Sequence, residues 1–488
     1  MIEPQLCDLS APGRQGVRFP QPDVPLTDLP TDLLRQELPM PELSEMDVVR
    51  HFTRLSQLNY SIDTGFYPLG SCTMKYNPKV NEETARLPGF AWAHPMQPIE
   101  TVQGSLVLMY QMQEWLKEIG GFAGVTLQPA AGAHGELTGV LIIRAYHKER
   151  GDEKRDKILI PDSAHGTNPA TSAMSGMRVV ELKSDARGNV DLQALRAECD
   201  NTLAGLMLTN PNTLGLFDEN VTEVVRLVHE AGGLVYGDGA NMNALLGVIR
   251  PGDLGIDVLH YNLHKTFSTP HGGGGPGSGP VGVCARLVDF LPGPLVDVIE
   301  EGDEEVPPLY GFIDPPKSIG RVKAFHGHFG MFVRAYTYML MNGADGLRKI
   351  AEYAVLNANY LLARLRNTYH VPYDRICMHE FVMEGRWDDA PGVQALDISK
   401  RLMDYKFHPP TNYFPLIVHE ALMIEPTETE NKETLDAFAD VLIKIAEEAH
   451  NEPQLLKDAP HITPVGRVDE VKAAKDLLLC CAVSATDK

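Results

Sequence analysis

The sequence lacks several features that would define other classes of protein. No apolar run approaches the roughly 18 residues that a membrane helix needs, and the first 18 residues mix both charges without an apolar signal segment. Internal repeats are absent, and the one low-complexity tract is the glycine-rich segment 272–279. We therefore expect neither a membrane protein nor a repeat protein.

Cysteine and positive charge are both scarce. The seven cysteines are scattered, apart from the pair Cys480 and Cys481, and form neither a zinc spacing nor a disulfide framework, which predicts a reducing, cytoplasmic compartment. Lys and Arg number 43 against 65 Asp and Glu, so the net charge is −22 and a nucleic-acid partner is disfavoured. At 488 residues the chain is too long for one core, and we expect two or more domains.

The stretch 256–280 carries the main candidate for chemistry. An apolar run of strand character, 256–259, leads into polar residues around Lys265, and the glycine-rich segment that follows cannot hold regular structure. A lysine lifted from bulk water at a strand end can act as an amine nucleophile toward carbonyls. On its own, the stretch is equally compatible with an ordinary surface lysine before a flexible loop.

A carboxylate follows the preceding predicted strand. Residues 234–236 have the pattern of a buried strand, and Asp238 lies at its C-terminal end, the edge where open α/β sheets bind ligands. Together, Asp238 and Lys265 suit pyridoxal 5'-phosphate, because the lysine can bind the cofactor's aldehyde while the carboxylate keeps the pyridine nitrogen protonated. A lone Asp at such a position is often only a helix N-cap, so the pair carries the prediction.

Strand and helix patterns alternate through the middle of the chain. The predicted strands include 157–161, 178–182, 203–209, 234–236 and 280–285. This alternation predicts an α/β fold with a mostly parallel central sheet. Four polar side chains follow the ends of predicted strands and are therefore expected at one edge of that sheet: His165, Asn212, Asp238 and Lys265.

Four motifs in combination resemble one enzyme family. They are GSCTMK at 70–75, SAHGTNPA at 163–170, GDGAN at 237–241 and HKT at 264–266. Together they are similar to glycine dehydrogenase (decarboxylating), the P-protein of the glycine cleavage system, within the fold-type-I pyridoxal-phosphate enzymes. The resemblance runs from about residue 60 to the C-terminal region. The length resembles that of the separate catalytic subunit, subunit 2, of the split two-subunit form.

The resemblance implies a fold-type-I transferase architecture with three parts. An N-terminal extended arm and helix over 1–62 precede a large cofactor-binding α/β domain over 63–325. Interdomain helices and a smaller α+β C-terminal domain follow over 326–488. The pattern of residues 1–43 agrees with this, because the segment is proline-rich and has no core-forming periodicity.

The cofactor's phosphate is expected at the start of a predicted helix. Gly132, Ala133 and His134 occupy that start, where small residues let backbone N–H groups approach an anion and the helix dipole favours it. The resemblance adds His264 as a further phosphate contact, with Asn262 as a weaker candidate.

The resemblance also implies contacts with the cofactor ring. His165 is expected to stack on the ring and to join Lys265 and Asp238 as a catalytic residue. Asn241 and Asn212 are expected to donate to the phenolic oxygen.

Two other site types are disfavoured. Cys72 lies in the turn-rich segment 65–78 without a dedicated base, so a packed polar turn is favoured over a catalytic thiol. A group of histidines lacks a carboxylate partner at ligand spacing, so no metal is expected there. These histidines are His260, His264, His271, His326 and His328.

We therefore expect pyridoxal-phosphate-dependent decarboxylation of glycine, with transfer of the aminomethyl group to the lipoyl group of the glycine cleavage H-protein. Glycine and the lipoyl carrier follow only from the resemblance. The resemblance to one half of the long P-protein and the proline-rich arm predict a homologous P-protein subunit 1 as partner, in a two-plus-two heterotetramer. The alternatives are another fold-type-I enzyme, such as a cysteine desulfurase or an aminotransferase, and a non-catalytic scaffold subunit of the same fold.

Overall fold

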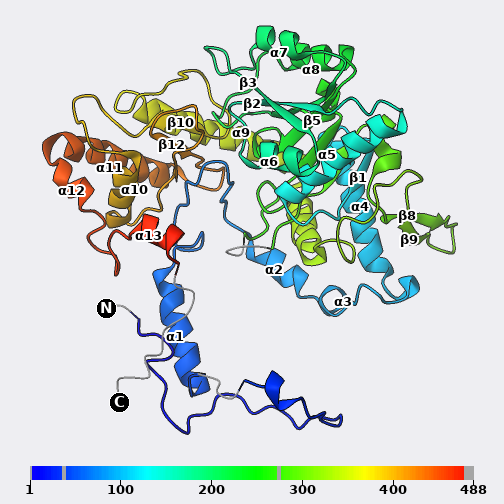
Figure 1. Cartoon of the computed structure of the whole chain (residues 1–488), viewed down its shortest axis with the longest axis horizontal. Helices are drawn as coiled ribbons and strands as arrows, with labels where there is room; N and C mark the ends of the chain where they lie inside the picture. The colour runs from blue at the N-terminus through cyan, green and yellow to red at the C-terminus, as the bar shows by residue number, and fades with distance from the viewer. Residues whose placement is uncertain (1–2, 36–39, 272–275, 478–488) are drawn as a thin grey trace. The chain divides into compact units, whose positions relative to one another are not determined.

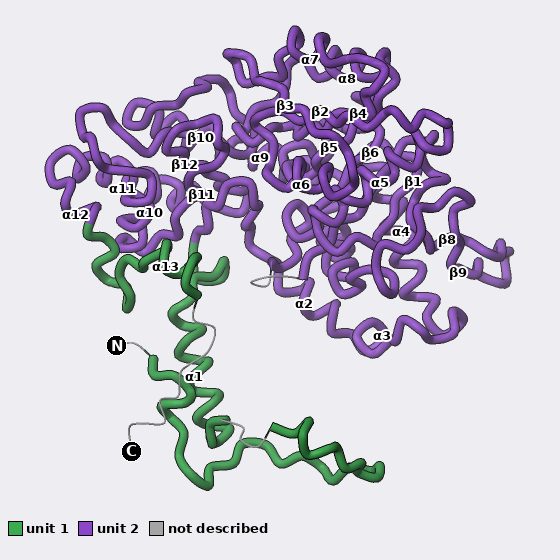
Figure 2. Tube along the Cα trace, viewed as in Figure 1, with its two compact units in different colours: residues 1–65, 458–488 green, residues 66–457 purple. Residues whose placement is uncertain are grey.

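The structure, a computed structural model (Figure 1), describes residues 3–35, 40–271 and 276–477. The chain divides into two compact units, 1–65 with 458–488, and 66–457 (Figure 2). The expected boundary at residue 62 lies close to the first of these divisions. The expected boundary at 325 falls inside the 66–457 unit, and the C-terminal residues from 458 belong with the N-terminal ones.

A central sheet, part of which is drawn as green arrows labelled β2, β3 and β5 in Figure 1, runs through the larger part of the 66–457 unit. It has seven strands in the order β1-β7-β6-β5-β4-β2-β3. Its strands are β1 (Gly124–Thr126), β2 (Lys157–Pro161), β3 (Arg178–Leu182), β4 (Leu203–Thr209), β5 (Leu234–Gly239), β6 (Val258–Tyr261) and β7 (Val281–Val283). Strands β3, β2, β4, β5 and β6 pair in parallel, and β7 runs antiparallel to both β6 and β1. The predicted mostly parallel α/β sheet is confirmed.

The sheet is apolar on both faces because helices cover both. Successive residues of a strand point to opposite faces, and Tyr236 packs in one hydrophobic cluster with α5 whereas Val235 packs in another with α4, α8 and α9. The helices around the sheet are α4 (Gln103–Gly120), α5 (Gly132–Glu149), α6 (Thr167–Met174), α7 (Leu192–Glu198), α8 (Val221–Glu230) and α9 (Phe329–Leu365). Every residue of β4 and β5 is therefore buried.

A second, smaller core follows within the same unit. It combines a three-stranded antiparallel sheet with helices that pack on one another. Its elements are β10 (Phe381–Glu384), β11 (Thr411–Asn412), β12 (Ala421–Ile424), α10 (Ala395–Asp404), α11 (Lys432–Asn451) and α12 (Pro453–Lys457). Helix α9 joins the two cores, since its residues up to Ala351 pack in the first and those from Ala358 in the second.

The remaining elements of this unit lie outside the two sheets. Gly343 interrupts α9 with a φ of 60°, a backbone conformation that glycine adopts without strain. A two-stranded hairpin and two short helices complete the unit: β8 (Leu295–Glu300), β9 (Leu309–Ile313), α2 (Lys79–Ala85) and α3 (Pro88–Ala91).

The N-terminal unit is organised around one helix, α1 (Glu45–Leu58). Ser44 caps it: the Ser44 side chain accepts from the Asp47 N–H, and the Asp47 carboxylate accepts from the Ser44 N–H in return. A short helix, α13 (Glu470–Lys475), lies in the C-terminal part of the unit. Among the described residues of the whole chain, no helix combines the length and apolarity needed to cross a membrane.

Candidate active site

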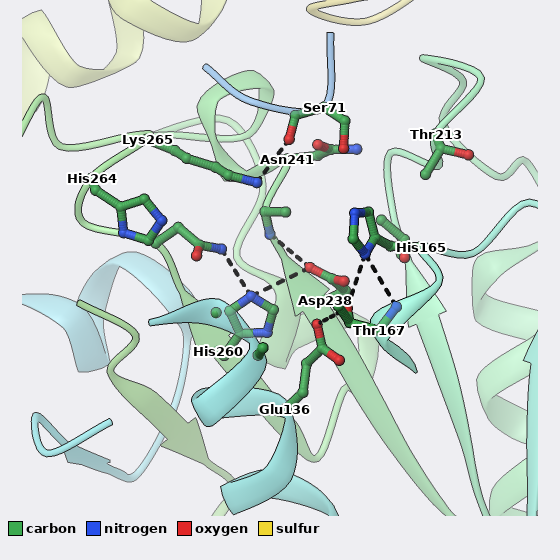
Figure 3. Close-up of a pocket in the computed structure, with 15 residues that line it drawn as sticks. Ser71, Glu136, His165, Thr167, Thr213, Asp238, Asn241, His260, His264 and Lys265 are labelled. Carbon is green, nitrogen blue, oxygen red and sulfur yellow. Dashed lines mark hydrogen bonds and ion pairs between the residues drawn. The ribbon is translucent and has the colours of Figure 1, made fainter. Parts of the chain in front are cut away.

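A cavity of about 220 Å³ opens at the C-terminal ends of β5 and β6 (Figure 3). Most of the predicted site residues line it: Gly132, Ala133, His165, Asp238, Asn241, Asn262, His264 and Lys265. They come from loops and strand ends that are far apart in the sequence but meet at one sheet edge, as the parallel topology requires. Two predicted residues, His134 and Asn212, do not line this cavity.

Asp238 is the penultimate residue of β5 and is 5% exposed. Its Oδ1 accepts a hydrogen bond from the Ala240 N–H at 2.9 Å and lies 3.4 Å from Nε2 of His260, which stands opposite it in the β5–β6 register. Burial alone would raise the pKa of Asp238, but His260, the Ala240 N–H and the Lys265 ammonium together hold it below its ordinary value. The site therefore contains a buried carboxylate that is ionised at neutral pH.

Lys265 reaches into the cavity from the turn that follows β6 (Figure 3). Its Nζ donates a hydrogen bond to the backbone carbonyl of Ser71 at 2.8 Å. Ser71 is 194 residues away in the chain, within the turn-rich segment 65–78. A neutral carbonyl thus positions the amine, and the amine points into the same space as Asp238 and His165.

The first turn of α5 forms another wall. A Cβ at Gly132 would lie 2.6 Å from Oδ1 of Asn262, and one at Gly135 would lie 2.7 Å from Cβ of His260, so only glycine permits this close packing against β6. The first N–H groups of a helix have no intrahelical acceptor, and the helix dipole makes this end positive. The turn is therefore suited to an anion such as a phosphate.

The two histidines predicted near the phosphate differ in position. His264 lines the cavity, and its Nδ1 accepts from the Ser278 N–H at 3.2 Å, which leaves Nε2 as a donor. Burial, with smaller effects from His271 and Lys265, lowers the pKa of His264 to about 3, so the ring is neutral. His134 instead accepts from the Ala130 N–H at 3.1 Å and stabilises the turn before α5; its contribution to the site is through that turn.

His165 stands on the opposite wall from Lys265 (Figure 3). Its Nδ1 accepts from the Thr167 N–H at 3.2 Å and lies 2.9 Å from the Thr167 hydroxyl. That hydroxyl is also 2.7 Å from Oε1 of Glu136. The ring of His165 is thus held in place by the start of α6 while its edge stays open to the cavity.

Glu136 is a site residue that the sequence analysis missed. It lies on α5, is 4% exposed and lines the cavity. Burial, and then the negative charge of Asp238, raise the pKa of Glu136 to about 7. Its position four residues after Gly132 would place it on the same helix face, one turn into the helix, and this spacing was the available signal.

The two predicted asparagines also differ. Asn241 lines the cavity and donates to the carbonyl of Pro211 at 2.8 Å. The structure does not bring Asn212 there: its Nδ2 donates to the carbonyl of Gly188 at 2.8 Å, and its Oδ1 accepts from the N–H groups of Leu214 and Leu216. Asn212 therefore stabilises its own turn after β4.

The fold is shared with pyridoxal-phosphate enzymes. Residues 138–274 match the aminotransferase class-V family. The structure superposes on a crystal structure of glycine decarboxylase (P-protein) of the glycine cleavage system in inhibitor-bound form, with a TM-score of 0.73 and 21% identity over 86% of this chain and 93% of that one. A cysteine desulfurase from Thermococcus onnurineus superposes with a TM-score of 0.60 and 15% identity, over 79% of this chain and 95% of that one. The chain has the fold-type-I architecture of pyridoxal-phosphate-dependent enzymes.

Sequence relatives identify one family within the fold-type-I enzymes. Residues 350–461 match the family described as glycine dehydrogenase, C-terminal domain. The probable glycine dehydrogenase (decarboxylating) subunit 2 of Caldanaerobacter subterraneus is 60% identical over 96% of both chains, and that of Alkaliphilus oremlandii is 59% identical over 97% of both. The same-named protein of Listeria monocytogenes is 55% identical over 98% of this chain and 97% of its own length. The chain belongs to the glycine dehydrogenase (decarboxylating) subunit 2 family.

The cofactor of this family is pyridoxal 5'-phosphate, and the residues present fit it. The cavity holds a lysine amine, an ionised buried carboxylate and a glycine-rich helix start, which are the groups that its aldehyde, its pyridine nitrogen and its phosphate require. When bound, the cofactor supplies an electron-withdrawing ring for chemistry at an amino acid's α-carbon.

Proposed function

We propose that this protein is the subunit that decarboxylates glycine and passes the aminomethyl group to the lipoyl group of the glycine cleavage H-protein. The observation that carries the proposal is the convergence of Lys265 and the ionised Asp238, from adjacent strand ends, on one cavity at the start of α5. The names of the relatives supply the substrate and the reaction type.

The residues divide the work by position. Lys265 binds the cofactor's aldehyde, and Asp238 holds a proton at the pyridine nitrogen because its carboxylate stays ionised. The helix start at Gly132 and Ala133, with Nε2 of His264 as donor, binds the phosphate. His165 packs against the ring face. Asn241 would donate to the phenolic oxygen by giving up its long bond from Nδ2 to Glu380, since its other Nδ2 proton is donated to the Pro211 carbonyl.

Among other fold-type-I reactions, cysteine desulfuration is the nearest competitor, because Cys72 lies close to the site. Its Sγ is 3.3 Å from Nε2 of His271. Burial raises the pKa of Cys72, however, and the nearby Lys265 lowers it only in part, while the carboxylates of Glu425 and Glu380 add to the rise. A thiol that stays protonated is a poor nucleophile, and this favours the decarboxylase proposal.

We also propose a homologous subunit 1 as partner, two copies of each chain forming the enzyme. The relatives are named as subunit 2 of a multi-subunit enzyme. The exposed apolar side chains on α1 support a partner surface, since Val49, Phe52 and Leu58 are 56%, 54% and 56% exposed.

A cytoplasmic location is proposed on the state of the cysteines. Five cysteines in the described part of the chain carry free thiols: Cys7, Cys72, Cys199, Cys284 and Cys377. Free thiols suit a reducing compartment.

The test is a glycine–bicarbonate exchange assay with the purified chain, its subunit 1 and lipoylated H-protein. We expect exchange with the two subunits together, little with this chain alone, and stimulation by the carrier. Sulfide release from cysteine, or transamination with a keto acid, at a rate above that of glycine turnover would replace the proposal with one of its alternatives. Full activity of this chain as a homodimer would contradict the proposed subunit 1.

A further inference from the structure

A buried cluster of three potential metal ligands lies in the smaller core and has no part in the proposed reaction. His379 and Glu380 directly precede β10, and Glu425 directly follows β12. Because β10 and β12 are antiparallel with Phe381 opposite Ile424, these three residues meet at the same end of the strand pair. Their exposed fractions are 0%, 0% and 1%.

The polar atoms of this cluster are incompletely satisfied. Within residues 3–35, 40–271 and 276–477, neither ring nitrogen of His379 has a hydrogen-bond partner, and neither does Oε2 of Glu425. Nε2 of His379 lies 3.8 Å from Oε1 of Glu380 and 4.0 Å from Oε1 of Glu425, too far for direct hydrogen bonds. Buried polar groups without partners are costly, and each requires an explanation.

We propose that His379, Glu380 and Glu425 bind a divalent cation, Zn²⁺ or Mn²⁺, through one imidazole nitrogen and two carboxylate oxygens. Their ligand atoms all lie within 4.8 Å of one another. Two ligands that are each about 2.1 Å from one ion lie at most about 4.2 Å apart, when they face each other across it, and about 3.4 Å apart in a tetrahedral site. The distances of 3.8 and 4.0 Å from the His379 nitrogen lie between these values, so the side chains would draw in by a few tenths of an ångström around a tetrahedral ion. The cation would satisfy the histidine, and the two carboxylates would balance its charge.

The surrounding groups orient the carboxylates as a metal site requires. Glu380 accepts from the Ser71 N–H at 2.7 Å through Oε2, and from Nδ2 of Asn241 at 3.3 Å through Oε1. Oε1 of Glu425, the oxygen 4.0 Å from Nε2 of His379, accepts from the Thr73 hydroxyl at 2.5 Å, and this bond fixes the carboxylate while its Oε2 has no partner among the described residues. Such outer hydrogen bonds fix ligating carboxylates and are typical of protein metal sites.

Two lysines, Lys75 and Lys265, lie near the cluster, but among the described residues neither amine is bound to Glu380 or Glu425. Lys75 forms its own buried ion pair with Glu428 at 2.7 Å. Lys265 contacts the Ser71 carbonyl rather than a carboxylate. Both amines are thus bound by groups outside the cluster, although their charges still act on Glu425.

The proposed metal site would affect the active site by holding Ser71, and through it Lys265, in position. The Glu380 carboxylate accepts a hydrogen bond from the Ser71 N–H, and the carbonyl of Ser71 accepts one from the Lys265 amine. A cation bound to Glu380 and Glu425 would fix segment 71–73 on the ends of β10 and β12, and with it the rest position of the lysine.

The experiment uses the cofactor-loaded full chain, stripped of metal with a chelator and titrated with Co²⁺, Zn²⁺ or Mn²⁺ alone. We expect one ion per chain after gel filtration, measured by plasma mass spectrometry, and visible ligand-field bands with Co²⁺. The variants His379→Gln and Glu425→Gln should weaken binding at least about tenfold. The matched control is His229→Gln, which removes a histidine whose Nε2 already contacts Asp257 at 2.7 Å, and it should bind metal like the wild type.

Two results would overturn the proposal. One is a wild-type chain that retains no stoichiometric ion, which would leave water or a shared proton to satisfy the cluster. The other is unchanged binding in both ligand variants, which would place the ion elsewhere. If these variants fail to fold, X-ray absorption of the wild-type Co²⁺ form decides: we expect nitrogen and oxygen scatterers, and a sulfur scatterer contradicts the assignment.

Discussion

The sheet of the 66–457 unit and the N-terminal part of the other unit are stabilised in different ways. Every residue of β4 and β5 is buried. In the described residues of 1–65, by contrast, the buried side chains are Leu43 and His51 alone, and the apolar face of α1 is exposed. The sheet can therefore fold around its own core, whereas the N-terminal segment contributes almost nothing to one.

This difference explains where the chemistry is found. Asp238 stays ionised in a buried place because the strands around it fix His260, the Ala240 N–H and Lys265, and such fixed groups need a rigid scaffold. The N-terminal segment has no comparable surroundings, but it keeps apolar surface available, which supports the proposed partner.

The largest effect is expected for Lys265→Ala. The variant should lose the visible absorbance of the lysine-bound cofactor and all turnover, because no other amine lines the cavity in the described part of the chain. The control is Lys157→Met: Lys157 is also buried, at 2% exposed, but pairs with Glu198 and Asp200. It should lower the free energy of unfolding and keep the absorbance band. Retained turnover in Lys265→Ala would contradict the site assignment.

Asp238→Asn should keep the cofactor but slow the reaction by roughly 10²–10⁴-fold, the usual range for such proton-holding groups. A neutral amide cannot hold the proton at the pyridine nitrogen. Single-turnover kinetics with glycine on the reconstituted enzyme measures the effect. A loss of less than about tenfold would mean that Asp238 only stabilises the turn after β5, by accepting a hydrogen bond from the Ala240 N–H.

Much of the large domain could be predicted from the sequence. Strands β2, β3 and β4 have the bounds predicted for 157–161, 178–182 and 203–209, because short apolar runs between turn-forming residues are typical of buried parallel strands. Lys265 and Asp238 were found because each follows such a run. The rule that ligands bind beyond strand C-termini then placed them together.

Three features of the site could not be predicted from the sequence, each for a physical reason. The depth of Glu136 depends on how α5 packs against β5 and α6, which helical spacing alone does not reveal. The contact of Ser71 with Lys265 joins residues 194 positions apart, and no local pattern encodes it. Asn212 follows a strand, as predicted, but its side chain is hydrogen-bonded to backbone groups of its own turn and of Gly188.

A smaller effect is expected on the pH dependence of stability. Glu136 has a folded-state pKa of about 7 against an ordinary value of 4.5, because burial and then the negative charge of Asp238 raise it. Hydrogen bonds from Thr167 and Thr171 of α6 lower this pKa and offset only part of the rise. The folded protein thus keeps a proton that the unfolded chain has lost. The stability from this proton is fully present below pH 4.5 and is lost as the pH rises through about 7.

Glu136→Gln should flatten this fall, which amounts to at most about 1.4 kcal/mol per pH unit. Urea unfolding at several pH values between 4.5 and 8 measures the slope. Glu149→Gln, an exposed position at the other end of α5, is the control and should leave the slope unchanged. An equal change of slope in both variants would show that Glu136 is not the cause of the fall in stability.

The smallest effect on the isolated chain is expected for Phe52→Ser on α1. Because Phe52 is 54% exposed, its replacement should change the free energy of unfolding by less than about 0.5 kcal/mol. The same variant should weaken association with subunit 1, measured by analytical ultracentrifugation, whereas the exposed polar control Gln57→Ser should not. Unchanged association in Phe52→Ser would separate α1 from the partner surface.

The most direct test of the central claim locates the cofactor on the chain. Borohydride reduction of the cofactor-loaded protein, followed by proteolysis and peptide mass spectrometry, identifies the amine that holds it. The account predicts one reduced cofactor adduct per chain, on Lys265. An adduct on Lys75 or on a surface lysine, with Lys265 unmodified, would contradict it.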